Sequence, residues 1–193
     1  MIMKKIILPN IYYSNGLLIG NNVEKVVRKI KDLNGLFDDE ASLNKIDPDT
    51  IVYEVSSHLE EKEGREGGLF FGITYLYPGK VGNEYFMTKG HYHAKIDRTE
   101  YYWGIEGEGV LILMDEDRNV CGEKIFPGSL HYIKSGIAHR VANTGTQILS
   151  FGACWPSDAG HCYDTIAKNG FSARLREING TAVLEDSKKL LYV

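Results

Sequence analysis

Two histidines one residue apart, His91 and His93, follow a Thr-Lys-Gly stretch in this sequence. In a β-strand, residues i and i+2 point to the same face, so both imidazoles can share one ligand. Glu100 comes seven residues after His93, and His139 stands much further along the chain. Three neutral imidazoles and one carboxylate suit a first-row divalent metal and leave coordination positions open for a substrate. Any one of these histidines alone would more simply be a hydrogen-bonded polar residue, so the predicted metal site depends on the whole set.

The elements that would hold these side chains are short β-strands. From Ile51 onward, runs rich in β-branched and aromatic residues alternate with turn residues. The predicted strands span residues 50–58, 69–77, 83–89, 99–106, 109–116, 129–134, 138–143 and 147–155. A short helix is predicted over 163–170, followed by terminal strands over 171–178 and 181–185. Many short strands at this spacing predict a closed or sandwiched antiparallel β structure in which β-strands dominate.

The N-terminal part carries a different pattern. Apolar residues recur at helical spacing between Asn22 and Gly35, at Val23, Val26, Val27, Ile30 and Leu33. This spacing predicts a helix over 22–35, with Asn22 as its cap and Gly35 at its end. Residues 38–50 are polar and are expected to form a connection. We therefore expect one domain over 1–193, with an N-terminal extension over about 1–50, a barrel core over 51–155 and C-terminal elements over 156–193.

Composition excludes several classes of protein. The chain has 193 residues, 43 % apolar and 25 % charged, which is ordinary for a globular domain. A formal charge of −4 leaves no basic surface for nucleic acid or anionic lipid. The apolar run after the N-terminal lysines is three residues long, and a secretory signal needs about 7–15. Three cysteines without a CxxC pair indicate free thiols, and we expect a cytoplasmic protein with no membrane or nucleic-acid partner.

Two spaced motifs around the histidines resemble those of the cupin superfamily. The matching positions, beyond His91 and His93, are Glu100, Gly107, Gly128, Gly136, His139 and Asn143. Lys134 stands where the second motif has proline, and the spacing from His93 to Glu100 is longer than usual for cupins. The resemblance implies a double-stranded β-helix, a jelly-roll-like barrel, with an N-terminal helix and short C-terminal elements.

A narrower resemblance covers about Val52 to Phe171. The segments "YPGKVGNEYFMTKGHYHAKIDRTEYYWGIEGEG" and "DAGHCYDTIAKNGFS" resemble the cupin-type (archaeal-type) glucose-6-phosphate isomerases. The family has the same elongated loop between its histidine pair and its glutamate. The resemblance implies a metal-dependent aldose–ketose isomerase of glycolysis or gluconeogenesis that interconverts glucose 6-phosphate and fructose 6-phosphate. It also implies a homodimer with one divalent metal per subunit, Fe(II) first, with Zn(II), Mn(II) and Ni(II) also compatible.

The resemblance also assigns individual residues. It implies His91, His93, Glu100 and His139 as metal ligands and Glu100, His161 and Tyr102 as catalytic residues. The implied sugar and phosphate contacts are Thr74, Thr88, Lys89, Gly90, Trp155 and Tyr163. Threonine hydroxyls and a glycine amide beside a lysine can offer several donors to a phosphate dianion, although Thr-Lys-Gly alone would more simply be a turn.

Some of these positions also have plainer interpretations. Trp155 stands where the family typically has tyrosine, and its larger indole can donate a hydrogen bond but cannot accept one. By default, Asp158 is a surface acid and His161 a loop residue.

Two other functions use the same residues. A three-histidine, one-glutamate cupin site also suits a metal-dependent dioxygenase, which activity without oxygen would exclude. A non-catalytic sugar-phosphate-binding cupin would bind the ligand without turnover. For the isomerase, two routes are open: Glu100 removes the C2 proton to form an enediol, or hydrogen passes directly between C2 and C1 while Glu100 serves only as a ligand. A carboxylate bound to a divalent ion loses basicity, and we favour the enediol route slightly.

Overall fold

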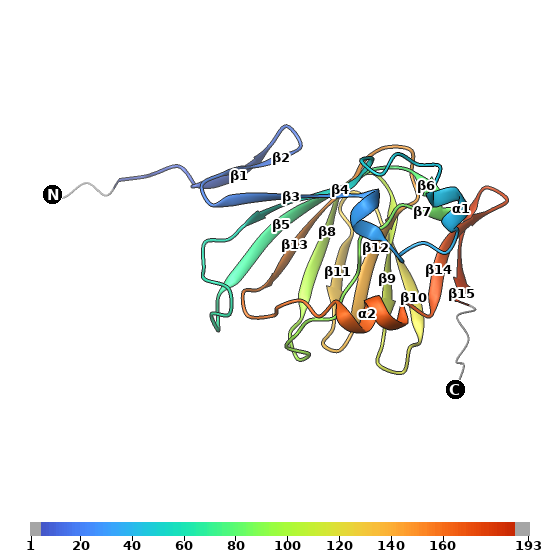
Figure 1. Ribbon diagram of the computed structural model, residues 1–193. Coiled ribbons are helices and arrows are strands. Elements are labelled where there is room, and N and C mark those ends of the chain that lie inside the picture. Colours follow the sequence, from blue (N-terminus) through green and yellow to red (C-terminus); the bar gives the residue numbers. More distant parts are fainter. Residues whose placement is uncertain (1–4, 188–193) are drawn as a thin grey trace.

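The computed structural model describes residues 5–187, and antiparallel strands make up most of it (Figure 1). A six-stranded sheet has the order β11-β8-β13-β5-β4-β3, and a three-stranded sheet has the order β10-β9-β12. The large sheet consists of β3 (Val23–Lys29), β4 (Ile51–His58), β5 (Leu69–Leu76), β8 (Glu100–Glu106), β11 (Leu130–Ile133) and β13 (Leu149–Pro156). The small sheet consists of β9 (Gly109–Met114), β10 (Val120–Ile125) and β12 (Ala138–Asn143). This arrangement confirms the predicted antiparallel, β-dominated fold.

Side chains from both sheets meet in one apolar cluster. Val52, Leu76 and Phe151 come from the large sheet, and Leu111 and Val141 from the small one. All five are at most 2 % exposed. The strands alternate inward apolar and outward side chains as half-buried strands do, so the two sheets are held together by the burial of their inner faces. Every residue of β12 is buried, because packing covers both of its faces.

Smaller elements decorate this core. β1 (Ile11–Ser14) and β2 (Leu17–Gly20) form a hairpin that extends away from the barrel (Figure 1). A four-stranded sheet of order β15-β14-β7-β6 is built from β6 (Lys80–Val81), β7 (Glu84–Tyr85), β14 (Ala173–Ile178) and β15 (Thr181–Asp186). The helices are short: η1 (Ile30–Leu33, a 3-10 turn), α1 (Glu40–Leu43) and α2 (Asp164–Asn169). Within residues 5–187, none of the helices has the length and apolar character that crossing a membrane requires.

Most predicted elements are confirmed, including the short helix and the two terminal strands. The predicted strand over 83–89 is mostly irregular, since β7 ends at Tyr85 and Met87 makes only an isolated bridge to Ala142. Besides β3, four strands were not predicted: β1, β2, β6 and β10. Asn15 and Gly16, between β1 and β2, both have positive φ, as a tight two-residue hairpin turn requires.

The predicted helix over 22–35 is wrong. Residues 23–29 form β3, which pairs antiparallel with β4 from Val23 opposite His58 onward, and only Ile30–Leu33 are helical. Valines are stiff at χ1 and favour strands, and the edge of β4 supplies the hydrogen-bond partners. Asn22 caps no helix; its φ is 54° and its amide donates to Glu60 over 2.8 Å. Because β3 extends the large sheet, this N-terminal segment can contribute side chains next to the barrel.

Candidate functional site

The four predicted metal ligands come from both sheets and from the segment between them. Glu100 is the first residue of β8, and His139 is the second residue of β12. His91 and His93 lie in the irregular chain between β7 and β8. His91 pairs with His139 through two backbone hydrogen bonds of 3.2 and 3.1 Å, which place residues far apart in the sequence next to each other.

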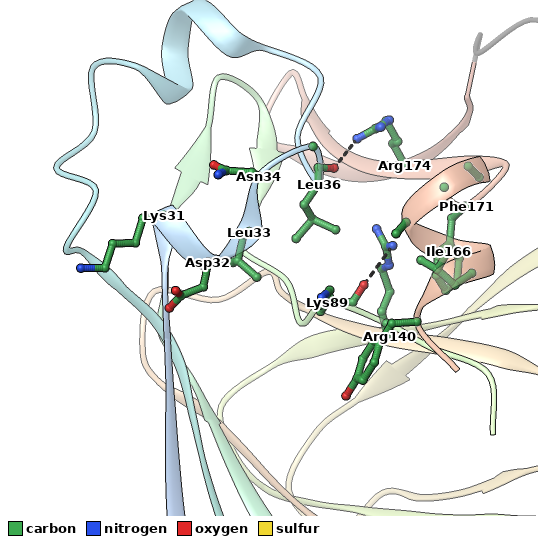
Figure 2. Close-up of a pocket in the computed structure, with 16 residues that line it drawn as sticks. Lys31, Asp32, Leu33, Asn34, Leu36, Lys89, Arg140, Ile166, Phe171 and Arg174 are labelled. Carbon is green, nitrogen blue, oxygen red and sulfur yellow. Dashed lines mark hydrogen bonds between the residues drawn. The ribbon is translucent and has the colours of Figure 1, made fainter. Parts of the chain in front are cut away.

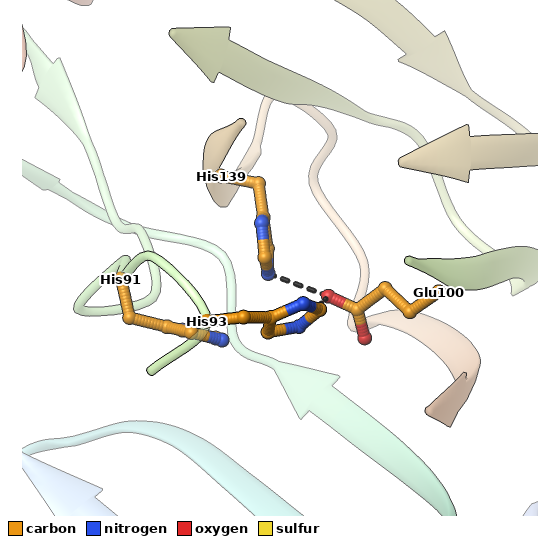
Figure 3. A group of neighbouring side chains, drawn as sticks. All are labelled: His91, His93, Glu100 and His139. Carbon is orange, nitrogen blue, oxygen red and sulfur yellow. Dashed lines mark ion pairs between the residues drawn. The ribbon is translucent and has the colours of Figure 1, made fainter. Parts of the chain in front are cut away.

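The ligand atoms of these residues converge. One donor atom from each of His91, His93, Glu100 and His139 lies within 4.8 Å of the others. Glu100 Oε1 is 2.6 Å from His139 Nε2 and 3.3 Å from His93 Nε2 (Figure 3). Neither Glu100 Oε1 nor His139 Nε2 makes a hydrogen bond within the described residues, although both are buried. Buried polar atoms without partners are costly and rare, and a cation among these donors would satisfy them.

The second nitrogen of two imidazoles is fixed by the backbone. His93 Nδ1 lies 3.0 Å from the carbonyl oxygen of Arg98, and His139 Nδ1 lies 3.1 Å from that of Ile137. In the tautomer that binds a metal, an N–H at Nδ1 donates to each carbonyl and Nε2 presents its lone pair to the cluster. Metal-binding histidines are usually held in this way. The residues present therefore fit a divalent metal.

Electrostatics favour the same assignment. Burial and the neighbouring imidazoles lower the pKa of His91 well below its ordinary value, which keeps it neutral. Burial alone would raise the pKa of Glu100, but His139 and His93 outweigh it and lower this pKa to about 2. The cluster thus offers an ionised carboxylate and at least one neutral imidazole, the forms in which these groups bind metals.

A cavity of about 250 Å³ opens beside the cluster. Its lining includes His91, Glu100 and His139, whereas His93 is not among its walls. All the predicted sugar and phosphate residues also line it: Thr74, Thr88, Lys89, Gly90, Tyr102, Trp155, His161 and Tyr163. The structure therefore brings together, around one cavity, residues that the sequence spreads from position 74 to position 163.

Contacts with neighbouring residues hold the Thr88–Gly90 segment in place. Thr88 Oγ1 accepts a hydrogen bond from the Val141 amide over 3.0 Å, which leaves the hydroxyl hydrogen free to donate into the cavity. Gly90 has a φ of +75°, and a Cβ there would lie 2.9 Å from both Arg140 Nε and Phe171 Cε2. Only glycine fits this position without a shift. Lys89 Nζ lies 4.8 Å from the centre of the Tyr163 ring, a cation–π contact at the cavity wall.

Arg28 and Tyr53 are two of the lining residues that the sequence analysis missed. Arg28 lies on β3, the segment that had been predicted as a helix, so nothing placed it near the site. Tyr53 lies on β4, and its hydroxyl accepts the amide hydrogen of Lys89 over 3.4 Å. Burial raises the pKa of Tyr53 and keeps its hydroxyl protonated. A prediction of residues 23–29 as a strand would have placed Arg28 on the edge of the large sheet next to β4.

Trp155, at the family's tyrosine position, is accommodated by a glycine on the neighbouring strand. A Cβ on Gly72 would lie 3.1 Å from Trp155 Cη2 and 3.0 Å from Ser57 Oγ. The Phe70 ring packs against the indole at a centroid distance of 5.9 Å, nearly edge-on. The larger ring is therefore seated between neighbours that leave room for it.

Asp158 is not the surface acid that the sequence suggested. Its side chain is 1 % exposed and accepts hydrogen bonds from Lys95 Nζ over 2.7 Å and from Arg98 Nη2 and Nε over 2.8 and 3.0 Å. Lys95 and Arg98 belong to the loop between His93 and Glu100, and Asp158 belongs to the loop that carries His161. This carboxylate therefore connects the loop between two predicted metal ligands to the loop of a predicted catalytic histidine.

Asp158→Asn should lower the free energy of unfolding at pH 7, because it removes the charge that Arg98 and Lys95 share. Those two cations hold the pKa of Asp158 well below its ordinary value. The contribution of the Asp158 charge to the free energy of unfolding is therefore present above the unfolded pKa of about 3.9. This contribution is lost as pH falls toward the folded pKa. Urea unfolding should show a gap between wild type and variant that narrows below about pH 4. Asp97→Asn, at the exposed partner of Arg98, is the control with little effect; an equal loss at pH 3 and pH 7 would contradict the account.

Comparisons with known proteins identify the family of this chain. The family model described as "Glucose-6-phosphate isomerase (GPI)" matches residues 27–190. The glucose-6-phosphate isomerase of Thermococcus litoralis is 45 % identical over 170 residues, which cover 87 % of this chain and 88 % of the relative. That of Pyrococcus abyssi is 41 % identical and covers 92 % and 93 %. Among solved structures, oxalate decarboxylase from Bacillus subtilis matches 57 % of this chain and 26 % of its own, at 17 % identity and a TM-score of 0.44, a likeness too low to carry an argument.

Proposed function

Since this chain belongs to the cupin-type glucose-6-phosphate isomerase family and interconverts glucose 6-phosphate and fructose 6-phosphate, we propose that one group of side chains binds a metal and a second group binds the phosphate of the sugar. We call the first group the metal cluster and the second the phosphate cradle. The cluster is His91, His93, Glu100 and His139, and the cradle is the Thr88–Gly90 segment with Thr74. The observation that carries the proposal is that both border one cavity. The dioxygenase and the non-catalytic alternatives find no support among the relatives.

The cradle would hold the end of the substrate that does not react. The hydroxyls of Thr74 and Thr88 and the amide of Gly90 can donate to phosphate oxygens, and Lys89 adds a positive charge nearby. Binding energy from this remote group can be used to position the reacting carbons. Tyr102 and His161 line the same cavity and would contact the sugar.

The four ligands would hold one divalent metal. When bound, such an ion polarises the sugar carbonyl and stabilises negative charge on its oxygen. A set of three imidazoles and one carboxylate is compatible with Fe(II), Zn(II), Mn(II) and Ni(II), and we place Fe(II) first. The protein's own part is to keep His91 neutral, to fix the rings of His93 and His139 and to keep Glu100 ionised.

Glu100 would also move the proton. One of its oxygens faces His139, and the other turns away from that imidazole (Figure 3). In the enediol route, this second oxygen would take the proton from C2 of the open-chain aldose and return it to C1. The hydroxyl proton on O2 would pass to O1 in the same conversion, so that C2 becomes the ketone and C1 the alcohol. A pKa of about 2 makes Glu100 a weak base, so the route depends on the C2 hydrogen being acidified by the polarised carbonyl next to it.

His161 and Tyr102 would assist from the cavity wall. His161 is an exposed residue in the cavity wall, where partial loss of water around its ring lowers its pKa. Its imidazole is therefore neutral near pH 7 and can accept a proton from a ring hydroxyl during ring opening. Burial raises the pKa of Tyr102 well above its ordinary value, and the charge of Glu100 adds to this shift. Tyr102 therefore stays a phenol that can donate a hydrogen bond to a sugar oxygen.

Chelation should abolish the conversion of fructose 6-phosphate to glucose 6-phosphate, and reloading with a first-row divalent metal should restore it. The reason is that the carbonyl would lose its polarising charge while the cradle still binds phosphate. A coupled assay on chelated and reloaded protein measures this. His139→Ala should lose bound metal and activity together and keep its β-type circular dichroism, whereas full activity in metal-free protein would contradict the proposal.

The role of Glu100 can be separated from metal binding. Glu100→Gln keeps the size and one oxygen ligand but removes the base, so the enediol route predicts a fall in kcat of about 10²–10⁴. In the wild type, glucose 6-phosphate deuterated at C2 should lose much of its label to water. Mass spectrometry of the product and metal analysis of the variant give both readouts. Full transfer of label to C1, together with a metal-loaded Glu100→Gln enzyme near the wild-type rate, would leave Glu100 as a ligand only.

We also propose a cytoplasmic homodimer. The outward side chains of β8 and β11 form an exposed apolar patch of cross-strand pairs, Trp103 with Leu130 and Tyr101 with Tyr132. They are 47 to 67 % exposed, and the two tyrosine rings lie 5.0 Å apart. Contiguous apolar patches usually mark interfaces, and a second copy of the same sheet would cover this one. Three free cysteines suit a reducing compartment.

Trp103→Glu should shift the protein from dimer to monomer, because it places a charge in the centre of this patch. Sedimentation-velocity ultracentrifugation measures the change. Ile96→Glu is the matched control, since Ile96 is 46 % exposed and lies in the loop before β8, outside the patch. A wild-type protein that sediments as a monomer would contradict the proposal.

A further inference from the structure

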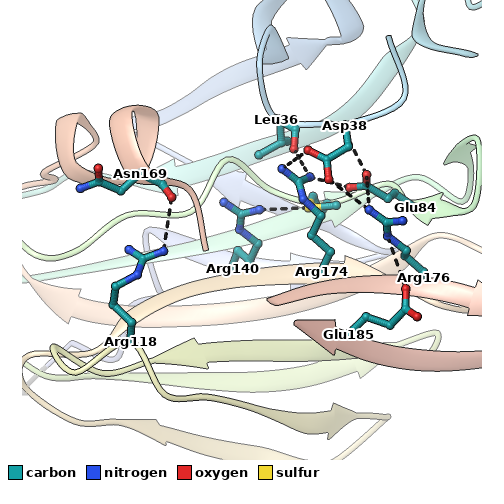
Figure 4. Close-up of polar contacts among 10 residues, drawn as sticks. Leu36, Asp38, Glu84, Arg118, Arg140, Asn169, Arg174, Arg176 and Glu185 are labelled. Atoms are coloured by element: carbon teal, nitrogen blue, oxygen red, sulfur yellow. Dashed lines mark hydrogen bonds and ion pairs between the residues drawn. The ribbon is translucent and has the colours of Figure 1, made fainter. Parts of the chain in front are cut away.

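Arg140 is a buried cation that the isomerisation does not use. It follows His139 on β12, and its side chain leaves the opposite face of the strand, away from the metal cluster. It is 5 % exposed. Its guanidinium lies 3.9 Å from the centre of the Phe171 ring and reaches the Met87 sulfur over 3.2 Å and the Lys89 carbonyl over 3.3 Å (Figures 2 and 4).

The charge of Arg140 is unpaired among residues 5–187. No carboxylate forms an ion pair with it, and its Nε has no hydrogen-bond partner. The neighbouring Arg174 gives the contrast. It is 7 % exposed, and its guanidinium pairs with Glu84 over 2.8 Å and with Asp38 over 2.7 Å (Figure 4). A buried charge without a counter-ion is expensive, so the surroundings of Arg140 favour an anion.

A cavity of about 210 Å³ lies next to this guanidinium, outside the sugar cavity (Figure 2). Four of its lining residues are cationic, namely Lys31, Lys89, Arg140 and Arg174. Asp32 is the one acidic residue in its lining, and its carboxylate already accepts the Lys29 amide hydrogen over 2.9 Å. The remaining walls are largely apolar, formed by Leu33, Leu36, Ile166 and Phe171.

We propose that this cavity binds a small oxyanion, a phosphate or carboxylate group, through Arg140. The planar guanidinium presents a fork of donors that suits either group, and the apolar walls would hold a short organic body. This site is separate from the phosphate cradle, although Lys89 and Gly90 lie between the two cavities and border both. The assignment itself requires only the unpaired cation and the cavity.

Its effect on the enzyme rests on the proposed function. Arg140 donates to the Lys89 carbonyl, and Gly90 packs directly on Arg140 Nε, so the cradle is supported by the residue that would bind the anion. An anion at Arg140 would repel the sugar phosphate on the other side of this segment. Its occupancy should therefore raise the KM for fructose 6-phosphate and leave kcat unchanged, and by linkage substrate should weaken anion binding.

The test is a titration of metal-loaded protein that has first been saturated with the equilibrium mixture of the two sugar phosphates. Inorganic phosphate and propionate are added separately and followed by isothermal titration calorimetry. At least one of the two anions should bind at one site per chain. Binding of phosphate alone would assign the site to a phosphate group, and binding of propionate alone would assign it to a carboxylate. Binding of both would show that the site accepts either group. Arg140→Met should weaken this binding by about 10- to 150-fold, the usual loss for a bond to a charged group. Binding of neither anion by the wild type, or unchanged binding by Arg140→Met, would overturn the assignment.

Three further variants serve as controls for this result. Arg176→Met removes an arginine that belongs to the ion-pair network of Arg174 and does not line the cavity, and this variant should bind the anion as the wild type does. Ala167→Trp fills the cavity from the exposed face of α2 and should abolish binding even if Arg140→Met fails to fold; retained binding would count against the site. Thr88→Val should raise the KM for fructose 6-phosphate but keep the anion site, so failure of the cradle and failure of this site are distinguishable.

Discussion

A buried carboxylate among three imidazoles is the constraint on which the rest of this structure depends. Glu100 is held in its ionised form by His139 and His93, although burial opposes its charge. Each of its neighbours is oriented by a backbone bond or by strand pairing: His93 by the Arg98 carbonyl, His139 by the Ile137 carbonyl and His91 by its pairing with His139. A cation among these donors would satisfy the buried Glu100 and His139 atoms that otherwise have no hydrogen-bond partner within the described residues.

Both sheets and two loops position this cluster. β8 and β12 bring one ligand each from opposite sheets, and the irregular segment before β8 brings the other two. Asp158 fixes the loop between His93 and Glu100 to the loop of His161. On the far side of β12, Arg140 supports the Thr88–Gly90 segment. The proposed metal cluster and the proposed phosphate cradle are thus connected through β12 and the chain that pairs with it.

Much of the site could be predicted from the sequence, because the ligands lie in short motifs whose spacing determines where side chains point. His91 and His93 share a face through their i, i+2 spacing, and the "DAGH" segment locates His161. The helix predicted over 22–35 failed because Val23, Val26 and Val27 fit helical spacing as well as an edge strand, and only pairing with β4 decides between them. Arg28 and Asp158 were missed or misread for a related reason: their roles come from partners far along the chain. The Asn15-Gly16 hairpin carried a recognisable turn signal that the analysis did not use.

The most direct measurement of the central claim is X-ray absorption at the metal edge of the chelated protein reloaded with one equivalent of Co(II). The account predicts one tightly held ion per chain, with a first shell of nitrogen and oxygen atoms and the multiple-scattering pattern of three imidazoles. That pattern should lose one imidazole in His91→Ala, and adding fructose 6-phosphate should change the oxygen shell. A shell with fewer than three imidazoles in the wild type, or a spectrum that His91→Ala leaves unchanged, would show that the cluster is not the metal site.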